Sequence, residues 1–290
     1  MDGVIIINKP KNYTSHDIVY KIKKILGEKV GHTGTLDPLA QGVLPILIGK
    51  ATKCSAYLTN HDKTYQVELK LGIKTETADG EGNILQEENV SEEILKKEYV
   101  EKVLLSMVGK QEQVPPIYSA IKVNGKKLYE YARKGQEVEI KPREITIYSM
   151  KLNNINIEQK TINFTVECSK GTYIRSLCED IASKLGTIGY MNNLVRIKVG
   201  KFSIQDSISI DDLIYANNPK EKLEEKIITI EELFENVGKI ELNQKSLNLF
   251  LNGVKISEFK SDGIYKIYCN TDFIGIGSIK NERLKREIVL

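Results

Sequence analysis

Apolar and polar residues in the first part of the chain change their period several times. An apolar run at Val4 to Ile7 is typical of a buried strand, and Leu44 to Ile48 form a second run. Between them lies a predicted helix that starts from a capping residue at Thr14 or Ser15 and ends before Gly27. The apolar residues that share one face of this helix are Ile18, Ile22, Ile25 and Leu26. The pattern therefore predicts mixed α and β structure.

Two further segments alternate between apolar and polar residues, as half-buried strands do. Their apolar members are Tyr65, Val67, Leu69 and Leu71 in the first segment, and Ile162, Phe164, Val166 and Cys168 in the second. Two more helices are predicted from apolar spacing and end signals. One runs from a cap at Ser91 through Met107 and is closed by Gly109. The other follows the turn Ser169-Lys170-Gly171 and ends at Gly186.

The last third of the chain changes its charge and its pattern. From Asp211 to Glu235 there are eight acidic residues and three lysines, around the break Asn217-Asn218-Pro219. From Lys239 onward there are nine basic and six acidic residues, and strand-like alternation returns between Ile264 and Ile276. We interpret the first segment as an acidic connection and the second as a small all-β module.

Length and composition predict a folded protein with one large domain or two. The 290 residues contain no run of the roughly 18 apolar residues that a membrane span requires, and the opening MDGVIIINKP is no signal peptide. We therefore expect a cytoplasmic protein. The four cysteines and three histidines are scattered without a C-x-x-C pair, which argues against a disulfide framework and against a metal site. A net charge of +3 is only a weak indication of a polyanionic partner.

A basic and aromatic segment lies between Val114 and Arg143. It contains a Pro-Pro break, a short predicted helix and three tyrosines. Its exposed basic residues are Lys126, Lys127, Arg133 and Lys134. Such a segment suits RNA binding, although tyrosines at this spacing also pack onto protein surfaces. By contrast, Glu76 to Asn83 has turn composition and an incomplete calcium-binding pattern at Asp79 and Glu81, so we interpret it as a surface loop.

The stretch GHTGTLDPLAQGVL, Gly31 to Leu44, is rich in glycine but fits none of the common nucleotide motifs. It is no phosphate loop, because six residues separate Gly42 from Gly49 where four are required, and Ala51 stands where a magnesium-binding hydroxyl belongs. The G-x-G-x-x-G pattern of a dinucleotide site is missing, and no G-x-S-x-G nucleophile elbow occurs in the chain. These three kinds of site are therefore excluded.

Taken one at a time, the polar residues near these segments have ordinary interpretations. Asp37 precedes a proline, where an aspartate usually caps a turn, and His32 alone is typical of a structural hydrogen bond. Tyr65 opens an alternating strand and by itself indicates core packing. Arg175 falls in the first turn of a predicted helix, where the helix dipole disfavours a cation. We therefore expect a carboxylate partner for Arg175, in a surface ion pair or at a functional site.

Four segments, in chain order, resemble the TruB family of tRNA pseudouridine synthases, most closely its bacterial branch. They are GHTGTLDPLAQGVLPILIGKATK at 31–53, KTYQVELKLG at 63–72, PPIYSAIKVNGKKLYEYARKG at 115–135 and CSKGTYIRSL at 168–177. The resemblance runs from Gly3 to about Val199. Beyond residue 200 it weakens, and the residues from 239 onward are similar to the family's small RNA-binding β-module of the PUA type.

The resemblance implies that the protein isomerises uridine 55 in the T-loop of tRNA to pseudouridine, without cofactor or metal. The reaction breaks the bond between ribose C1′ and uracil N1, turns the uracil, and joins C5 to C1′. A stacked base must first be flipped out, so the site needs a group that stacks on it. It also needs one ionised carboxylate, and a neighbouring guanidinium favours the charged form of such a group.

Carried over residue by residue, the resemblance assigns a role to each candidate. Asp37 matches the catalytic aspartate, and Arg175 in GTYIRS matches the arginine that pairs with it. Tyr65 matches the tyrosine that stacks on the target base and helps with the C5 proton. The remaining substrate-binding matches are His32, which supports the displaced loop, and Tyr173 and Leu194, which line the base and nucleotide. Lys9-Pro10 resembles a structural turn and is assigned no chemistry, and we expect the glycines around Asp37 to give RNA room to approach.

The expected architecture is α+β, the pseudouridine synthase fold, with a mixed, largely antiparallel central sheet and flanking helices. We expect a catalytic domain at 1–210 with an RNA-contacting insertion at about 113–142. An acidic connecting segment at 211–238 and a β-barrel-like, PUA-type module at 239–290 follow. The sheet topology is implied by the resemblance. The expected partner is the T-arm of tRNA, bound by a monomer without a membrane.

Two other functions are compatible with the same scaffold. One is a non-catalytic protein that binds or folds tRNA, and the presence of Asp37, Tyr65 and Arg175 argues against it. The other is a synthase that works on a guided RNA inside a larger particle, which the short C-terminal module and the lack of long charged tails disfavour. The residues leave open whether Asp37 attacks C1′, attacks the uracil ring or removes the C2′ proton.

Overall fold

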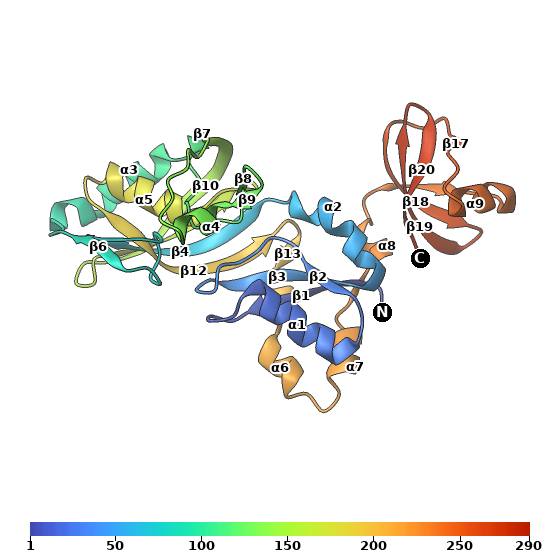
Figure 1. The fold of residues 1–290 in the computed structure, drawn as a ribbon, viewed down its shortest axis with the longest axis horizontal. Coiled ribbons are helices and arrows are strands. Elements are labelled where there is room, and N and C mark those ends of the chain that lie inside the picture. The colour runs from blue at the N-terminus through green and yellow to red at the C-terminus, as the bar shows by residue number, and fades with distance from the viewer.

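One mixed sheet of eleven strands forms the body of the protein, which the computed structural model describes over residues 1–290 (Figure 1). Its strands are β1 (Gly3–Lys9), β2 (Val30–His32), β3 (Gln41–Ile48), β4 (Lys63–Leu71), β7 (Gly109–Gln113), β10 (Arg143–Asn156), β11 (Thr161–Cys168), β12 (Gly189–Val199), β13 (Phe202–Ser203), β14 (Ile208–Ser209) and β15 (Ile228–Thr229). The main path runs β14-β1-β3-β12-β4-β11-β10-β7. Only the β1–β14 and β3–β12 pairs are parallel, so the predicted mixed, largely antiparallel sheet is confirmed.

The two halves of this sheet are covered differently. In β4, Tyr65 and Val67 are buried on one face while Gln66 on the other face is exposed, as the alternation predicts. In β1 and β3 almost every residue is buried, because both faces are covered by helices. The covering elements are α1 (Ser15–Leu26) on one face, and η1 (Gly49–Cys54) and α2 (Ser55–Thr59) on the other.

The first helix follows its predicted signals. The Asp17 amide donates to the Thr14 hydroxyl and the Thr14 amide donates to the Asp17 carboxylate, which forms a capping box at the start of α1. Gly27 ends the helix with a left-handed φ of 69°. The helix predicted after Ser169-Lys170-Gly171 is also confirmed as α5 (Ile174–Lys184), which packs against β12.

The helix predicted from Ser91 to Met107 was wrong as a single element. A short 3₁₀ turn, η2 (Glu92–Leu95), comes first, and Lys96 in an extended conformation separates it from α3 (Lys97–Ser106). The break lets both pieces bury apolar residues in one core cluster. Gly109 does not close the helix, because it lies at the start of β7 with a φ of 124°.

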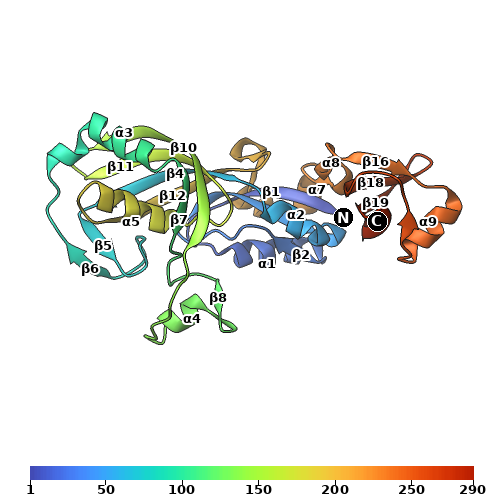
Figure 2. The same ribbon diagram turned by 90° about the horizontal axis from the view of Figure 1, so that it is seen from above.

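Two small hairpins stand apart from the main sheet. The first joins β5 (Ile73–Thr75) to β6 (Ile84–Glu87). The second lies in the basic segment and consists of β8 (Lys122–Val123) and β9 (Lys126–Lys127), followed by α4 (Leu128–Ala132). Seen from above, this basic hairpin and α4 project away from the body (Figure 2). The segment predicted to contact RNA is thus a protrusion with a large exposed surface.

The acidic segment is folded rather than extended. It forms most of α6 (Ile210–Ile214), followed by α7 (Pro219–Glu224) and α8 (Ile230–Leu233), and the short turn η3 (Ile204–Asp206) precedes it. Asn218 caps α7 by accepting a hydrogen bond from the Glu221 amide, and Pro219 occupies the first turn. Leu213 and Leu223 are buried in the same core cluster as β1 and α1. The acidic residues therefore lie on short helices that pack on the body of the protein.

The C-terminal module has its own sheet and core at one end of the molecule (Figure 1). Its strands are β16 (Gly238–Glu241), β17 (Ile256–Ser257), β18 (Gly263–Cys269), β19 (Asp272–Lys280) and β20 (Arg283–Val289), in the order β16-β18-β19-β20-β17. The prediction that it is all-β was wrong. It also contains α9 (Gln244–Leu251), which Asn243 caps and which buries Leu247 and Phe250 three residues apart on one face.

The module packs firmly on the body. Ile276 and Ile288 belong to the same hydrophobic cluster as Val4 and Phe202 of the large sheet. The Tyr268 hydroxyl also donates a hydrogen bond of 2.6 Å to a carboxylate oxygen of α8.

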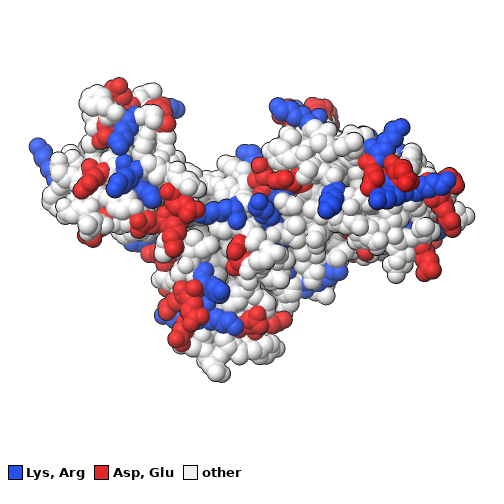
Figure 3. Space-filling model, turned by 180° about the vertical axis from the view of Figure 1, so that it is seen from behind, with Lys and Arg blue, Asp and Glu red and all other residues white.

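Seen from behind, acidic and basic side chains are interspersed across both the body and the C-terminal module (Figure 3). No helix in the chain has both the length and the apolar character needed to cross a membrane.

Candidate active site

A cavity of about 730 Å³ opens between β4, β12, the turn before α5 and the base of the basic hairpin. We call it the Asp37 cavity. Five of the six predicted site residues line it, namely Asp37, Tyr65, Tyr173, Arg175 and Leu194. Its other charged lining residues are Lys63, Arg143, Lys170, Arg196 and Glu144, so basic side chains outnumber acidic ones by five to two. This local excess of positive charge suits a polyanion, in contrast to the mixed surface behind it (Figure 3).

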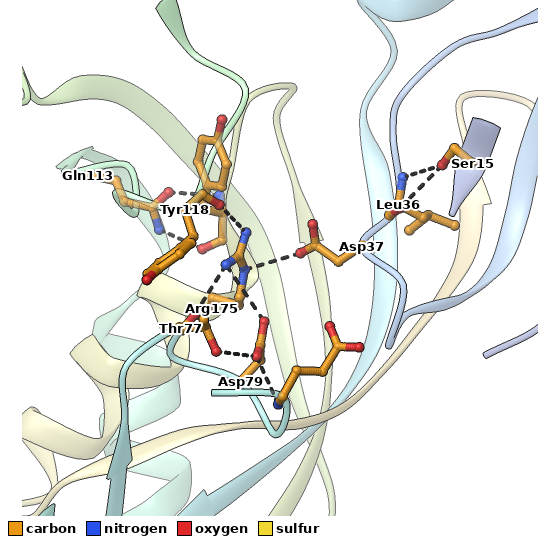
Figure 4. Close-up of polar contacts among 10 residues, drawn as sticks. Ser15, Leu36, Asp37, Thr77, Asp79, Gln113, Tyr118 and Arg175 are labelled. Atoms are coloured by element: carbon orange, nitrogen blue, oxygen red, sulfur yellow. Dashed lines mark hydrogen bonds and ion pairs between the residues drawn. The ribbon is translucent and has the colours of Figure 1, made fainter. Parts of the chain in front are cut away.

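The centre of the cavity is an ion pair between Asp37 and Arg175 (Figure 4). The Arg175 Nε lies 3.1 Å from the Asp37 Oδ2. The Arg175 side chain is only 7% exposed, whereas that of Asp37 is 38% exposed and faces the open cavity. The carboxylate partner expected for Arg175 is therefore confirmed. It offsets the unfavourable position of a cation at the start of α5.

Arg175 is held by two further chain segments. Its Nη1 donates to the Thr77 carbonyl at 3.1 Å, and its Nη2 donates to the Tyr118 carbonyl at 2.9 Å (Figure 4). Asp79 Oδ2 lies 3.7 Å from Nη1 as a second carboxylate. Because these contacts fix the plane of the guanidinium, its Nε points toward Asp37 in a defined direction.

The interpretation of Glu76 to Asn83 as a surface loop was wrong for Asp79. Asp79 is only 3% exposed, and its Oδ1 accepts hydrogen bonds from the Thr77 hydroxyl and from the Glu81 amide. The burial follows from the ion pair with Arg175, which lies far from this loop in the sequence. Turn composition could indicate the loop itself, but not that one of its carboxylates points inward.

The loop that carries Asp37 is attached to the N-terminal segment on both sides of the aspartate. The Leu36 amide donates to the Ser15 hydroxyl at 3.0 Å, and that hydroxyl donates to the Leu36 carbonyl at 3.2 Å (Figure 4). The fully buried Lys9 ammonium donates to the carbonyls of Tyr13 and Pro38. Burial lowers the pKa of Lys9 to about 8. These contacts are consistent with a structural turn at Lys9.

Two glycines that flank Asp37, Gly34 and Gly42, differ in what surrounds them. A Cβ on Gly42 would lie 2.2 Å from the Arg196 carbonyl oxygen, and one on Gly34 would lie 3.4 Å from Arg196 Nη1. Both glycines also have positive φ angles, 104° and 67°. Gly42 is therefore required by the protein's own backbone. At Gly34 the contact is an ordinary one and the positive φ accounts for the glycine; this residue lines the Asp37 cavity, so room for RNA there stays a prediction. Gly31 is different, because its nearest neighbour would be a Thr52 methyl at 3.9 Å.

Tyr65 and Leu194 belong both to the core and to the cavity wall. Tyr65 is 8% exposed and Leu194 is 5% exposed, and both lie in the main hydrophobic cluster. Burial raises the pKa of Tyr65, and the positive charge of Arg196 acts in the opposite direction. The ordinary interpretation of Tyr65 as a core residue is thus also correct, and its ring forms part of an apolar wall.

Tyr173 stands immediately before α5 and is anchored through its backbone. Its amide donates to Gln113 Oε1 at 2.8 Å, and its carbonyl accepts from Gln113 Nε2 at 3.0 Å. Gln113 is only 4% exposed and comes from β7, at the edge of the sheet. Burial raises the pKa of Tyr173. The side chain therefore enters the cavity from a rigid backbone position.

His32 is the one predicted site residue that does not line the cavity. It lies in β2, with its ring edge-on to His16 at a centroid distance of 5.2 Å. Its Nδ1 is buried without a hydrogen-bond partner. Burial and the neighbouring His16 lower the pKa of His32 to about 4, so the ring is neutral at pH 7.

Sequence reasoning missed Arg196. This residue is 1% exposed and lies in the wall of the Asp37 cavity next to Tyr65. The available signal was its place in NNLVRI, where a charged residue follows Leu194 by two positions and so faces the same side of a strand. A charge at an inward position of a strand is rarely buried without a specific partner.

Comparison with protein families gives three adjoining matches. The family described as "TruB family pseudouridylate synthase (N terminal domain)" matches residues 22–174. The "tRNA pseudouridylate synthase B C-terminal domain" matches residues 175–235, and "Pseudouridine synthase II TruB, C-terminal" matches residues 238–289. Together these matches cover both the cavity and the C-terminal module.

Curated relatives match over nearly the whole chain. The tRNA pseudouridine synthase B of Clostridium kluyveri is 45% identical, and the alignment covers 98% of this chain and 98% of that protein. The protein of the same name from Clostridium tetani is 44% identical with the same coverage, and that of Bacillus cytotoxicus is 43% identical over 98% of this chain and 91% of its own length.

Solved structures share the fold at low sequence identity. A chain of a Cbf5-Nop10-Gar1 complex superposes with a TM-score of 0.72 at 24% identity, covering 99% of this chain and 85% of that one. A chain of an H/ACA RNP bound to a substrate RNA containing 2'-deoxyuridine gives a TM-score of 0.69 at 24% identity, covering 99% and 84%. At this level of identity, the similarity concerns the arrangement of strands and helices.

Proposed function

Because this chain belongs to the TruB family of pseudouridylate synthases, it is an isomerase that forms pseudouridine in tRNA, and we propose that its target is uridine 55 of the T-loop. The observation that supports catalysis in this cavity is the Asp37–Arg175 pair, which holds a carboxylate with 38% side-chain exposure in the Asp37 cavity. That geometry matches a reaction that needs one ionised carboxylate at a flipped nucleotide. The choice of uridine 55 rests on the resemblance of the four sequence segments to the family.

We infer that the flipped uridine lies between Asp37 and the apolar wall. Tyr65 stacks on the uracil, while Leu194 and Tyr173 line the space around the base and the nucleotide. The reaction exchanges a C1′–N1 bond for a C1′–C5 bond, and C5 loses a proton while N1 gains one. The net change needs no oxidant, reductant or second substrate, and we propose that it proceeds without cofactor or metal.

In this proposal Asp37 is the catalytic residue. Its carboxylate attacks C1′, attacks the uracil ring or removes the C2′ proton, and all three routes need the same oxygen close to the nucleotide. Arg175 orients the carboxylate through its Nε. Contacts from three chain segments hold the buried Arg175 and support a fixed direction of approach, which is what a positioned nucleophile or base requires.

We propose that the T-arm is held by the basic hairpin and the C-terminal module around the cavity. The hairpin and α4 place two cations around Tyr129. The half-buried Lys127 has its Nζ 5.3 Å from the ring centroid, and the exposed Arg133 has its Cζ 5.4 Å from it. Such cation and aromatic groupings suit single-stranded RNA. His32 does not line the cavity, and in this proposal it acts indirectly by supporting the displaced conformation of the T-loop. The enzyme acts as a monomer in the cytoplasm, where its tRNA substrate is found.

A position-specific assay tests the proposal. Transcribed tRNA labelled with tritium at uracil C5 is incubated with the protein in EDTA, and released tritium is measured together with the site of pseudouridine. We expect release from the wild-type transcript and from a T-loop hairpin, but none assigned to position 55 in a U55C transcript. Tight tRNA binding without tritium release would instead support the non-catalytic alternative, and modification only at another position would refute the choice of uridine 55.

A further inference from the structure

Arg196 lies in β12, between β4, which carries Tyr65, and β3, which follows the Asp37 loop. On one side, β12 pairs with β4 so that Arg196 is directly opposite Tyr65. On the other side, β12 pairs with β3 so that Arg196 is level with Gly42. Directly opposite residues in an antiparallel pair point to the same face of the sheet. Arg196 and Tyr65 therefore enter the Asp37 cavity from the same face, and both line it.

The guanidinium of Arg196 binds the Asp37 loop at both of its ends. Its Nη2 donates to the Gly34 carbonyl at 2.7 Å, and its Nε donates to the Val43 carbonyl at 2.8 Å. In the chain, Gly34 and Val43 stand on opposite sides of Asp37. A single planar group thus sets the distance between the start and the end of the catalytic loop.

The same guanidinium adjoins the Tyr65 hydroxyl. The charge of Arg196 acts to lower the pKa of Tyr65, against the larger effect of burial. If Arg196 served only to pack the loop, a neutral side chain would avoid the cost of burying a charge among three strands. The guanidinium instead lies beside two backbone carbonyls and the Tyr65 hydroxyl. This placement indicates that both its positive charge and its planar set of N–H donors are used.

We propose that Arg196 is a positioning residue of the catalytic site, which fixes the Asp37 loop and the Tyr65 phenol relative to each other through one buried guanidinium. The inference rests on the proposed function of the site. It adds a link between the carboxylate and the ring that the target base stacks on. Arg196 itself does not need to touch the RNA for this role, because it acts through Nε and Nη2, which donate to backbone carbonyls of the protein.

The expected behaviour differs from that of an RNA-binding arginine. Replacing Arg196 should slow the reaction of the bound complex and leave tRNA affinity unchanged, because its hydrogen bonds are made within the protein. We expect Arg196→Gln to reduce the single-turnover rate by about 100-fold with a Kd within about threefold of wild type. Arg196→Lys keeps the cation but loses the planar fork, so its rate should fall by about tenfold.

A double-mutant cycle with Tyr65 tests the coupling itself. Tyr65→Phe removes only the hydroxyl. If Arg196 acts partly through this group, the double variant Arg196→Gln with Tyr65→Phe should be no more than about threefold slower than the slower single variant. Lys198→Gln is the matched control, because it removes an exposed cation from the same strand and should leave the rate unchanged.

The experiment uses full-length protein, tRNA transcripts, single-turnover tritium release and filter binding, with circular dichroism to confirm folding. A rate for Arg196→Gln within about threefold of wild type overturns the proposal, as does a double variant whose loss equals the product of the two single losses. If the glutamine variant does not fold, a wild-type rate for Arg196→Lys overturns it. A wild-type protein inactive at uridine 55 would instead overturn the proposed function.

Discussion

Asp37 Oδ2 lies 3.1 Å from Arg175 Nε, and each residue accounts for the position of the other. The aspartate stands in a loop where its carboxylate would ordinarily cap a turn, yet it points to a guanidinium instead. The arginine stands in the first turn of a helix, where its charge is unfavourable without an anion nearby. The pair therefore stabilises two side chains that local rules would place elsewhere.

The first prediction concerns the carboxylate. Asp37→Asn keeps the shape of the side chain but removes its charge, so pseudouridine formation should fall by at least about a thousandfold, or about 4 kcal/mol of barrier. The affinity for tRNA should remain within about tenfold, because one carboxylate among many contacts acts mainly in the transition state. Single-turnover tritium release and filter binding measure the two quantities.

Asp62→Asn is a suitable control for this prediction, because it removes an acidic side chain outside the cavity lining. Its rate should stay close to wild type. If Asp37→Asn retained more than a few per cent of the wild-type rate, Asp37 would not be the catalytic group.

Parts of the fold and site could be predicted because they depend on neighbours in the sequence. The capping box at Thr14, the end of the helix at Gly27 and the alternation of β4 are local signals, and the structure follows each of them. The need for a carboxylate near Arg175 also follows from a local rule, the direction of the helix dipole.

The remaining features depend on segments that only the folded chain brings together. The loop around Asp79 has the composition of a solvent-exposed turn, and its carboxylate is buried only because Arg175 reaches it from another element. The helix α9 is a different case, because its cap at Asn243 and the apolar spacing of Leu247 and Phe250 are local signals. The prediction of an all-β module rested on the alternation between Ile264 and Ile276 and did not use them. The role of Arg196 required the pairing of β12 with both β3 and β4.

The second prediction concerns Gly42. In Gly42→Ala the new Cβ would lie 2.2 Å from the Arg196 carbonyl oxygen, at a φ of 104° that alanine rarely adopts. The β3–β12 pair must therefore separate, and the free energy of unfolding should fall by about 2 to 4 kcal/mol. Denaturant unfolding followed by circular dichroism measures this change.

Gly31→Ala provides the matched control in the same glycine-rich stretch. Its Cβ would meet only a Thr52 methyl at 3.9 Å, so the change in unfolding free energy should stay within about 0.5 kcal/mol. Equal effects of the two substitutions would show that the contact with Arg196 does not determine the need for glycine at position 42.

The third prediction concerns pH and His32. Its pKa in the folded protein is lowered from 6.5 to about 4 by burial, so the unfolded chain takes up a proton first as the pH falls. The neutral His32 ring therefore adds its full contribution to the free energy of unfolding above pH 6.5. This contribution decreases as the pH falls from 6.5 toward 4. With allowance for partial exposure, the loss is on the order of 2 kcal/mol.

Urea unfolding at pH 7.5 and pH 4.5 tests this prediction. The difference in unfolding free energy between the two pH values should be smaller for His32→Gln than for wild type. His16→Gln should keep most of the wild-type difference, because burial is the main cause of the shift at His32. A difference for His32→Gln as large as that of wild type would mean that other groups account for the acid sensitivity.

The last prediction concerns the basic hairpin that projects from the body in Figure 2. Replacing Lys126, Arg133 and Lys134 together by glutamine removes three exposed cations, so fewer counterions are released when tRNA binds. The Kd should rise by about tenfold at moderate salt, and the slope of log K against log salt should decrease in magnitude by about 2. The rate of the bound complex should change by less than about threefold, because the Asp37–Arg175 pair is intact.

A matched triple variant at Lys96, immediately before α3, and at two lysines within α3 controls for the change in net charge. Lys96, Lys97 and Lys102 are also exposed, and α3 lies on the opposite side of the molecule from α4 in Figure 2. Replacing these three lysines by glutamine should leave both the Kd and the salt slope close to wild type. If both triple variants weakened binding equally, the total charge of the protein rather than contact with the hairpin would attract the RNA.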